Sequence, residues 1–342
     1  MSAFINRINR RRSVLIGTVA VAAAAGIAVA VVPAGADGNP GAASKGTSGH
    51  AGHGAGDGIG VQSGQGTLTG GKGAIFAASL NGANEVPVQG GPAVGDKDGA
   101  ALQFIKVSGD KVSFAVKWRG VAKPTALHIH QGLKGANGGI KVDFTKLLAG
   151  AKGHRATGTV TVSDAALLQQ LKDNPNSFYA NLHTAEFPGG AVRGQLHKVS
   201  DPFDFRRALQ NFQASVVKGK QIYECKKGDD GKFSFQQRDV RAVLAGDIAH
   251  SFVAPNSGTP QWIVPDRSAV TGKLISKTAN GDANIAELDL AATQSGKKHG
   301  LLAGTAEILR LNTVGGVAPV GSCSPGAIVG VPYQADYVFI QR

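Results

Sequence analysis

Two short stretches of the sequence carry histidines in an alternating pattern that would bring their imidazoles to one side of a β-sheet. His128 and His130 are separated by a single isoleucine, so in a strand both rings lie on the same face. In the second stretch His183 follows a leucine and shares its face with Asn181. Imidazole nitrogen binds both zinc and copper, and three such ligands on neighbouring strands suffice for a site with an open position. His128, His130 and His183 are therefore a candidate copper or zinc site.

A third alternating stretch places more polar side chains near that candidate site. Arg193, Gln195 and His197 share one face, and with Asn181 they are the expected neighbours of the metal. Arg193 would either guide an anion to the site or donate to carbonyl oxygens of the neighbouring turn. Two alternatives need no metal. The histidines could pin loops through hydrogen bonds to residues such as Asn181 and Gln195, or they could line a polar ligand pocket.

The C-terminal half contains a second set of residues that could act as acid and base. The candidates are His250, Trp262 and Asp266, and a hydrolase or isomerase built on them needs His250 and Asp266 within hydrogen-bond reach. A histidine with a purely structural role at the start of a strand is the alternative. The sequence contains no Ser-His-Asp pattern, no cleft-forming carboxylate pair and no phosphate-binding glycine loop.

Strand patterns surround both sets of candidates, so we predict a mainly β fold. Residues 74–198 form the first predicted domain, residues 199–212 a connector, and residues 213–342 a second β-rich domain. One helix is predicted, with Ser163 as its N-cap and Leu167, Leu168 and Leu171 as its apolar stripe. A chain of 342 residues is long enough to bury two separate cores.

The N-terminal residues have the three-part pattern of a secretory signal peptide. Arg10, Arg11 and Arg12 precede an uncharged apolar segment over residues 14–32, and a small-x-small site ends at Ala36. The arginines also resemble a twin-arginine export signal. We predict export with residues 1–36 as signal peptide; an uncleaved anchor is the alternative, because the apolar segment could span a bilayer. The glycine-rich residues 37–73 are predicted to be a flexible, disordered tether.

Cysteine and charge content fit an exported protein. Cys225 and Cys323 are the only cysteines and predict one disulfide, with two buried free thiols as the alternative. The formal net charge is +13, and the basic residues outside the N-terminus are scattered. This surface favours an extracellular or envelope partner such as an acidic polymer. No basic cluster with interleaved aromatic residues supports nucleic acid, and membrane contact is expected only through an uncleaved signal segment.

Five motifs are distributed over residues 74–198. They are Phe76-x-Ala-x-Leu80-x-Gly82-x-x-Glu85-Val-Pro87, His128-Ile-His130-x-Gly132, Gly138-Gly139, Asn181-Leu-His183-Thr184 and Phe187-Pro-Gly-Gly190-x-x-Arg193-Gly-Gln195-Leu196. With these motifs the region resembles the chordin-type (CHRD) domain. The resemblance implies an immunoglobulin-like β-sandwich with a faint similarity to copper–zinc superoxide dismutase, and the bacterial members have no settled function. The bridging histidine and zinc-loop ligands of that enzyme have no counterpart here.

A second group of motifs lies in the C-terminal region. They are Gly219-x-Gln221-Ile-Tyr223-x-Cys225, His250-Ser-Phe252, Pro260-x-Trp262, Asp266-x-Ser268-x-Val270-x-Gly272, Arg310-x-Asn312-Thr313-x-Gly315-Gly316-x-Ala-Pro319, Cys323 and Val331-Pro332-Tyr333-x-Ala335-Asp336-Tyr337. This region resembles an exported bacterial and fungal family catalogued only as a domain of unknown function. Two positions depart from the pattern: Arg267 stands where a glycine is expected, and residues 287–290 lack the usual tryptophan. We therefore expect the family's fold here, and no family-specific loop geometry or pocket at these two positions.

Taken together, these patterns favour an exported binding or structural module without catalytic activity of its own. The alternative is a copper- or zinc-dependent redox protein that resembles superoxide dismutase and uses His128, His130 and His183. The two differ in one geometric requirement, because a metal site needs the three imidazoles to converge on one point.

Overall fold

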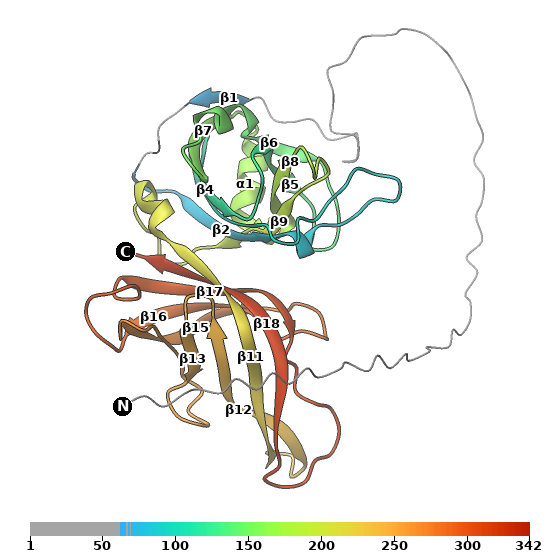
Figure 1. Ribbon diagram of the computed structural model, residues 1–342, viewed down its shortest axis with the longest axis vertical. Coiled ribbons are helices and arrows are strands. Elements are labelled where there is room, and N and C mark those ends of the chain that lie inside the picture. Colours follow the sequence, from blue (N-terminus) through green and yellow to red (C-terminus); the bar gives the residue numbers. More distant parts are fainter. Residues whose placement is uncertain (1–61, 66–67, 69) are drawn as a thin grey trace, which may run out of the picture. The chain divides into compact units, whose positions relative to one another are not determined.

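The computed structural model describes residues 62–65, 68 and 70–342, which form a β-sandwich followed by a closed β-barrel (Figure 1). The predicted signal peptide, residues 1–36, and most of the predicted tether lie outside the described residues. One strand, β1 (Gln62–Gln65), falls within the predicted tether and pairs with β7 (Arg155–Val162). The mainly β fold with a sandwich in front of a disulfide-closed domain is confirmed.

The sandwich is one continuous sheet whose strands run in the order β1-β7-β4-β3-β2-β9-β8-β5-β6. Its remaining strands are β2 (Ala74–Asn81), β3 (Ala100–Ser108), β4 (Lys111–Arg119), β5 (Pro124–Gln131), β6 (Ile140–Asp143), β8 (Phe178–Thr184) and β9 (Val192–Gln195), with the short β10 (His197–Lys198) paired with β2 outside this order. A single register pair, Asn81 with Arg193, joins the β2 half to the β8 half. The sheet can therefore fold back on itself and enclose one apolar core, which includes Phe76, Phe114 and Leu127.

Local sequence explains where these elements start and stop. β3 and β4 form the expected hairpin, with Gly109 at φ 58° in the turn, a conformation that glycine adopts without steric cost. Helix α1 (Ala165–Asp173) is capped by Asp164, whose side chain accepts from Leu167 N–H. The cap is thus one residue later than the predicted Ser163. In the described part of the chain, four 3₁₀ helices occupy Gly82–Asn84, Thr145–Gly150, Pro175–Ser177 and Phe205–Gln210, the last within the predicted connector.

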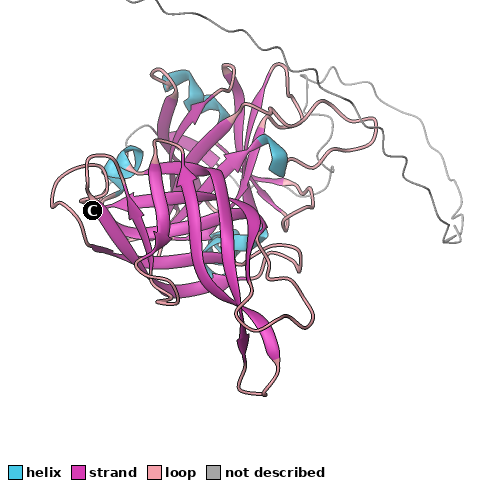
Figure 2. Ribbon diagram, turned by 60° about the horizontal axis from the view of Figure 1, so that its bottom comes forward, coloured by secondary structure: helices cyan, strands magenta, loops and turns pink. Residues whose placement is uncertain are grey.

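The second half closes into a barrel of eight antiparallel strands in sequential order (Figure 2). They are β11 (Phe212–Lys227), β12 (Phe233–Leu244), β13 (Ile248–Phe252), β14 (Pro260–Ile263), β15 (Ala269–Thr278), β16 (Glu287–Gln294), β17 (Thr305–Gly315) and β18 (Ile328–Gln341). A disulfide joins Cys225 on β11 to Cys323 in the loop before β18, closing a loop with a sequence separation of 98. The predicted disulfide is therefore present.

Two details of the barrel bear on its interior and its surroundings. Arg267, the residue in place of a family glycine, has φ 70°, the left-handed conformation that glycine tolerates best. The outer faces of β17 and β18 share an apolar cluster with β2 and β3, in which Leu309 and Val338 lie with Ile75 and Phe104.

No helix among the described residues is long and apolar enough to cross a membrane. That finding and the disulfide are both consistent with an exported protein.

Candidate functional site

The three histidines singled out by their spacing converge inside the sandwich. One ligand nitrogen from each of His128, His130 and His183 lies within 4.8 Å of the other two. Their side chains are buried, with exposed fractions of 2%, 0% and 0%. We call this group the trihistidine site.

Strand register explains the convergence. β5 and β8 are antiparallel neighbours, with His128 opposite Asn181 and His130 opposite Tyr179. Opposite residues on paired strands point to the same side of the sheet, and so do residues two positions apart. Both β5 histidines and His183 therefore occupy one polar face, while Leu127, Ile129 and Leu182 enter the apolar core.

Backbone carbonyl groups hold two of the rings. His130 Nδ1 lies 3.0 Å from the carbonyl oxygen of Gly138, and His183 Nδ1 lies 3.0 Å from that of Pro188. A carbonyl only accepts, so Nδ1 carries the proton in both rings and Nε2 keeps its lone pair in the neutral state. Metal-bound histidines are usually oriented in this way, by donation of the second ring N–H to a carbonyl or carboxylate.

His128 completes the site with the opposite ring orientation. Its Nδ1 lies 3.2 Å from His183 Nε2, and because that nitrogen is an acceptor, His128 Nδ1–H is the donor. At the other edge of the ring, His128 Nε2 lies 3.2 Å from Thr145 Oγ1 and 3.5 Å from Asp143 Oδ1. Moving the His128 proton to Nε2 would direct it toward Asp143 and Thr145. All three lone pairs could then face one point.

The spacing fits a first-row transition metal. Two nitrogens bound at about 2.0–2.1 Å to one tetrahedral ion lie about 3.3 Å apart. The separation of 3.2 Å between His128 Nδ1 and His183 Nε2 matches this value. Because no ligand nitrogen lies more than 4.8 Å from another, His130 would have to move closer by at most about 1.5 Å to reach the same separation. Neutral imidazoles suit both copper and zinc, so the donor set fits either ion.

Arg193 acts as a clamp on the loop that covers the site. Its guanidinium donates to the carbonyl oxygens of Leu133 and Ala136 at 3.1 and 2.8 Å, and to Asn137 Oδ1 at 3.0 Å. It also lies 3.5 Å above the ring of Tyr179. Of the two roles expected for Arg193, this geometry matches donation to the carbonyl oxygens of a turn, because its guanidinium makes these three hydrogen bonds to the loop.

Two further contacts connect Arg193 and its loop to His130. Tyr179 stacks on His130 with ring centroids 4.9 Å apart and planes 6° apart. Gln195 Nε2 donates to the carbonyl oxygen of Gly132 at 2.7 Å, which anchors the start of the same loop. Because this loop carries Gly138, whose carbonyl orients His130, Arg193 and Gln195 position a histidine they do not touch.

A buried acid lies on the same polar face. Glu85 accepts from Asn181 Nδ2 at 3.4 Å, and burial raises the pKa of Glu85 to about 8 against the opposing effect of Arg193. Gly190 approaches it closely, since a Cβ there would lie 2.6 Å from Glu85 Oε1. Glu85 belongs to the first CHRD motif, so that motif was the available signal for a residue the site prediction omitted.

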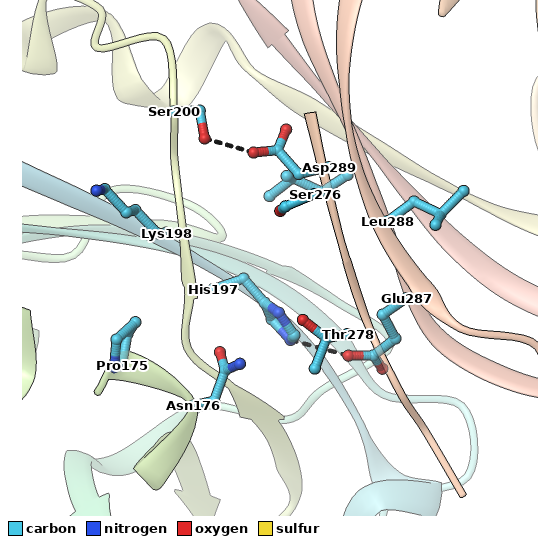
Figure 3. A pocket seen from close by; sticks show the side chains of 11 residues that line it. Pro175, Asn176, His197, Lys198, Ser200, Ser276, Thr278, Glu287, Leu288 and Asp289 are labelled. Atoms are coloured by element: carbon cyan, nitrogen blue, oxygen red, sulfur yellow. Dashed lines mark hydrogen bonds and ion pairs between the residues drawn. The ribbon is translucent and has the colours of Figure 1, made fainter. Parts of the chain in front are cut away.

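His197 lies in a different place from the other predicted neighbours. The chain leaves β9 at Leu196, and β10 (His197–Lys198) pairs with β2 instead. His197 lines a pocket of about 150 Å³ beside β15 and β16, where its Nε2 lies 3.4 Å from Glu287 Oε2 (Figure 3). Burial lowers the pKa of His197, and the Glu287 carboxylate opposes that shift.

Two more buried acids of the barrel, Asp289 and Glu307, lie close to this pocket, and Asp289 lines it. Ser200 Oγ donates to Asp289 Oδ2 at 2.5 Å, a contact drawn in Figure 3. Glu307 accepts from the backbone N–H groups of Ser200 and Asp201 at 2.9 and 2.6 Å. Burial, helped by the nearby Asp289 carboxylate, raises the pKa of Glu307 to about 8.

Of the predicted acid–base trio of the barrel, His250 and Trp262 are in contact, whereas Asp266 lies in a turn and bonds to other residues. His250 and Trp262 are opposite each other on β13 and β14, and their rings stack with centroids 4.4 Å apart. Asp266 instead caps a turn, accepting from Ser268 N–H and Oγ–H at 2.7 Å and from Leu301 N–H at 2.8 Å. Among the residues the structure describes, no hydrogen bond joins His250 to Asp266.

Comparison with known families places both halves of the chain. The family model of the CHRD domain matches residues 76–196, and the model described as "Protein of unknown function (DUF3455)" matches residues 245–341. The second match begins after β12, so the first two barrel strands lie outside it. No curated protein and no solved structure matches the chain.

Proposed function

We propose that this protein, whose chain carries a CHRD domain followed by a DUF3455 domain, is an exported binding protein that holds a copper or zinc ion at the trihistidine site. The observation that carries the proposal is the convergence of His128, His130 and His183 with two rings already oriented by backbone carbonyls. The ion would link β5 to β8 and would stabilise the folded state through ligands that are dispersed in the unfolded chain.

Burial favours metal binding over redox catalysis. A catalytic metal keeps a coordination position open to substrate, whereas each of the three histidines is at most 2% exposed. The edge nearest to solvent is that of His128, where the Asp143 side chain is 38% exposed. A dismutase-like activity remains the second candidate, because a small species such as superoxide could approach along this edge.

The test is the metal content of the whole exported chain, purified without a histidine tag and loaded separately with copper and zinc. We expect about one equivalent of one metal after dialysis, and less than a tenth of that in the His128→Ala/His130→Ala variant. His154→Ala is the matched control, because it removes an exposed imidazole of the same domain that lies near Trp118. A milder variant, His183→Gln, separates loss of metal from loss of fold when both are followed by thermal melting.

Two outcomes would overturn the proposal. One is that neither metal is retained after loading, and the other is that the variants bind as much metal as the parent. If copper is retained, superoxide and peroxide assays on the copper-loaded protein distinguish a metal that is only bound from a metal that carries out redox chemistry.

Without the four arginines of the predicted signal peptide, the formal net charge of +13 falls to +9 (13 − 4), which supports an anionic partner in the extracellular space or cell envelope as part of the same proposal. Retention of the protein on acidic envelope polymers at low salt, lost at high salt, is the expected result. Equal retention on neutral polymers would contradict it.

A further inference from the structure

The interior of the barrel contains a cavity that is separate from the trihistidine site. An eight-stranded barrel either fills its interior with side chains or holds one small ligand. Here the interior is only partly filled, and a cavity of about 550 Å³ is lined by residues from all eight strands. That volume lies within the range of small-molecule sites, which is about 300–1,000 Å³.

Two buried hydrogen-bond donors in the cavity wall have no acceptor among the described residues. They are Trp262 Nε1 on β14 and Gln221 Nε2 on β11, from side chains that are 0% and 1% exposed. The oxygen of the Gln221 amide already accepts from Gln237 at 2.6 Å, which fixes the orientation of its NH₂ group. An unsatisfied buried donor costs about 1–3 kcal/mol, so both groups favour an acceptor supplied from within the cavity.

The charge of the cavity is positive. Arg310 on β17 lines it and donates to the carbonyl oxygen of Ala286 at 2.8 Å, and no carboxylate of the described chain lies within ion-pair distance of it. Lys273 adds a second cation to the lining, and none of the lining residues is acidic. Burial lowers the pKa of His250 to about 4, so this ring is neutral near pH 7.

The remaining wall is apolar or aromatic. The His250–Trp262 stack, the Tyr337 ring and aliphatic side chains from β16 surround the polar groups. Gly272 makes room for the indole, because a Cβ at that position would lie 3.1 Å from Trp262 Cζ3. A ligand that fits this wall combines a compact acceptor group of negative charge with an apolar body.

We propose that the barrel binds a small monocarboxylate with an apolar body, whose carboxylate is held by Arg310, Trp262 Nε1 and Gln221 Nε2. One cation and two neutral donors suit a single negative charge and two acceptor oxygens. The apolar body would replace water against Leu288 and Leu290. This site is independent of the metal, and its test leaves the trihistidine site unchanged.

Calorimetric titration of the full-length protein with decanoate and with naphthalene-2-carboxylate, each beside its neutral amide, tests the proposal. We expect at least one acid to bind with one-to-one stoichiometry and at least tenfold more tightly than its amide. Trp262 fluorescence, followed in a Trp118→Phe background that leaves one tryptophan, should change with the same midpoint.

Variants localise the binding. Arg310→Gln should raise the Kd about tenfold to a hundredfold, the usual weight of a hydrogen bond to an ionised group. Arg241→Gln is the matched control, since it removes an exposed arginine of β12 outside this cavity. Leu274→Asp is a second variant at a lining position that is 53% exposed, where a new carboxylate should weaken anion binding without disturbing the fold.

The proposal fails if neither acid binds, if the amides bind as tightly as the acids, or if Arg241→Gln weakens binding as much as Arg310→Gln. Unchanged affinity in a folded Leu274→Asp variant would place the ligand elsewhere and would also overturn it.

Discussion

The two domains bury polar groups in opposite ways. In the sandwich, His130 and His183 both donate to backbone carbonyls, and one nitrogen from each of the three histidines lies within 4.8 Å of the others. In the barrel, Trp262 Nε1 and Gln221 Nε2 face a cavity of about 550 Å³ without an acceptor in the described chain.

This difference indicates which kind of ligand each interior suits. Oriented lone pairs in a tight group present ligands to an ion and leave no room for a molecule. Donors without acceptors around a positively charged space favour an anionic molecule and offer no lone pairs for a metal. The same residue type, histidine, serves both interiors, so its surroundings rather than its presence decide the chemistry.

Removal of the disulfide should produce the largest difference in stability between the two domains. Replacing Cys225 and Cys323 with alanine removes a constraint on a loop with a sequence separation of 98, which corresponds to about 4–5 kcal/mol in the chain-entropy account. We expect the barrel to unfold first in urea, with Trp262 fluorescence changing before Trp118 fluorescence. A single transition unchanged from the parent would show that the disulfide adds no stability.

Arg193→Ala should have the next largest effect, and it should reach the trihistidine site. The variant leaves three oxygens of the covering loop without their donor, and a buried group that loses its hydrogen-bond partner costs about 1–3 kcal/mol. Because the loop also orients His130, metal affinity should fall about tenfold to a hundredfold. Arg155→Ala, at an exposed position of β7, is the control for loss of one arginine. Loss of stability with unchanged metal affinity would contradict a positioning role.

One buried acid and one buried base of the barrel, Glu307 and His250, should make the stability of the folded protein depend on pH in opposite directions. Glu307 has a folded-state pKa of about 8 against 4.5 for the unfolded chain, so its stability contribution is complete below pH 4.5 and is lost as pH rises toward 8. The loss is at most about 1.4 kcal/mol per pH unit. Glu307→Gln should flatten the decline in urea-unfolding free energy over this interval. An unchanged slope would show that Glu307 ionises in the folded protein as it does in water.

His250 should give the opposite slope. Its folded-state pKa of about 4 lies below the ordinary 6.5, so its contribution is complete above pH 6.5 and is lost as pH falls toward 4. His250→Gln should remove about 1–2 kcal/mol of the acid-side loss of stability, as measured by urea unfolding between pH 4 and 7. A variant that loses stability with the parental slope would contradict the buried, neutral ring.

Arg267→Gly should give the smallest change, and its sign is favourable. The left-handed φ of 70° costs an arginine about 1 kcal/mol, which glycine avoids, although glycine also adds entropy to the unfolded chain. We expect a gain of about 0.5 kcal/mol in thermal or urea unfolding. A loss of more than 1 kcal/mol would show that the arginine side chain contributes contacts that outweigh its backbone strain.

Side-chain parity predicted that each of the three histidines lies on the face of its strand opposite the aliphatic residues, since the period of a strand is visible in the sequence. The pairing of β5 with β8, which brings His183 to the other two, was a condition of that prediction and is shown by the structure. Parity also grouped His197 with Arg193 and Gln195, and the structure separates them because the chain leaves β9 at Leu196 and continues on β2. Such a change of partner strand depends on pairing far along the chain, which local patterns do not contain. The contribution of Tyr179 and Glu85 to the site could not be derived from spacing alone for the same reason.

The barrel was predicted less completely than the sandwich. Alternating strands and the cysteine pair indicated a disulfide-closed β domain, but closure requires β11 to pair with β18, more than a hundred residues away. The stack of His250 on Trp262 follows from the register of β13 and β14, and Asp266 falls in the next turn. The cavity depends on volumes left between side chains, a property that no single segment of the sequence carries.

The most direct test of the trihistidine site is anomalous diffraction from crystals of the copper- or zinc-loaded protein, measured at both metal absorption edges. We predict one peak about 2.0–2.2 Å from a nitrogen of each of His128, His130 and His183, with the Nδ1 atoms of His130 and His183 still on their carbonyls. No peak at this position, or a peak held by other residues, would contradict the assignment of these histidines as metal ligands.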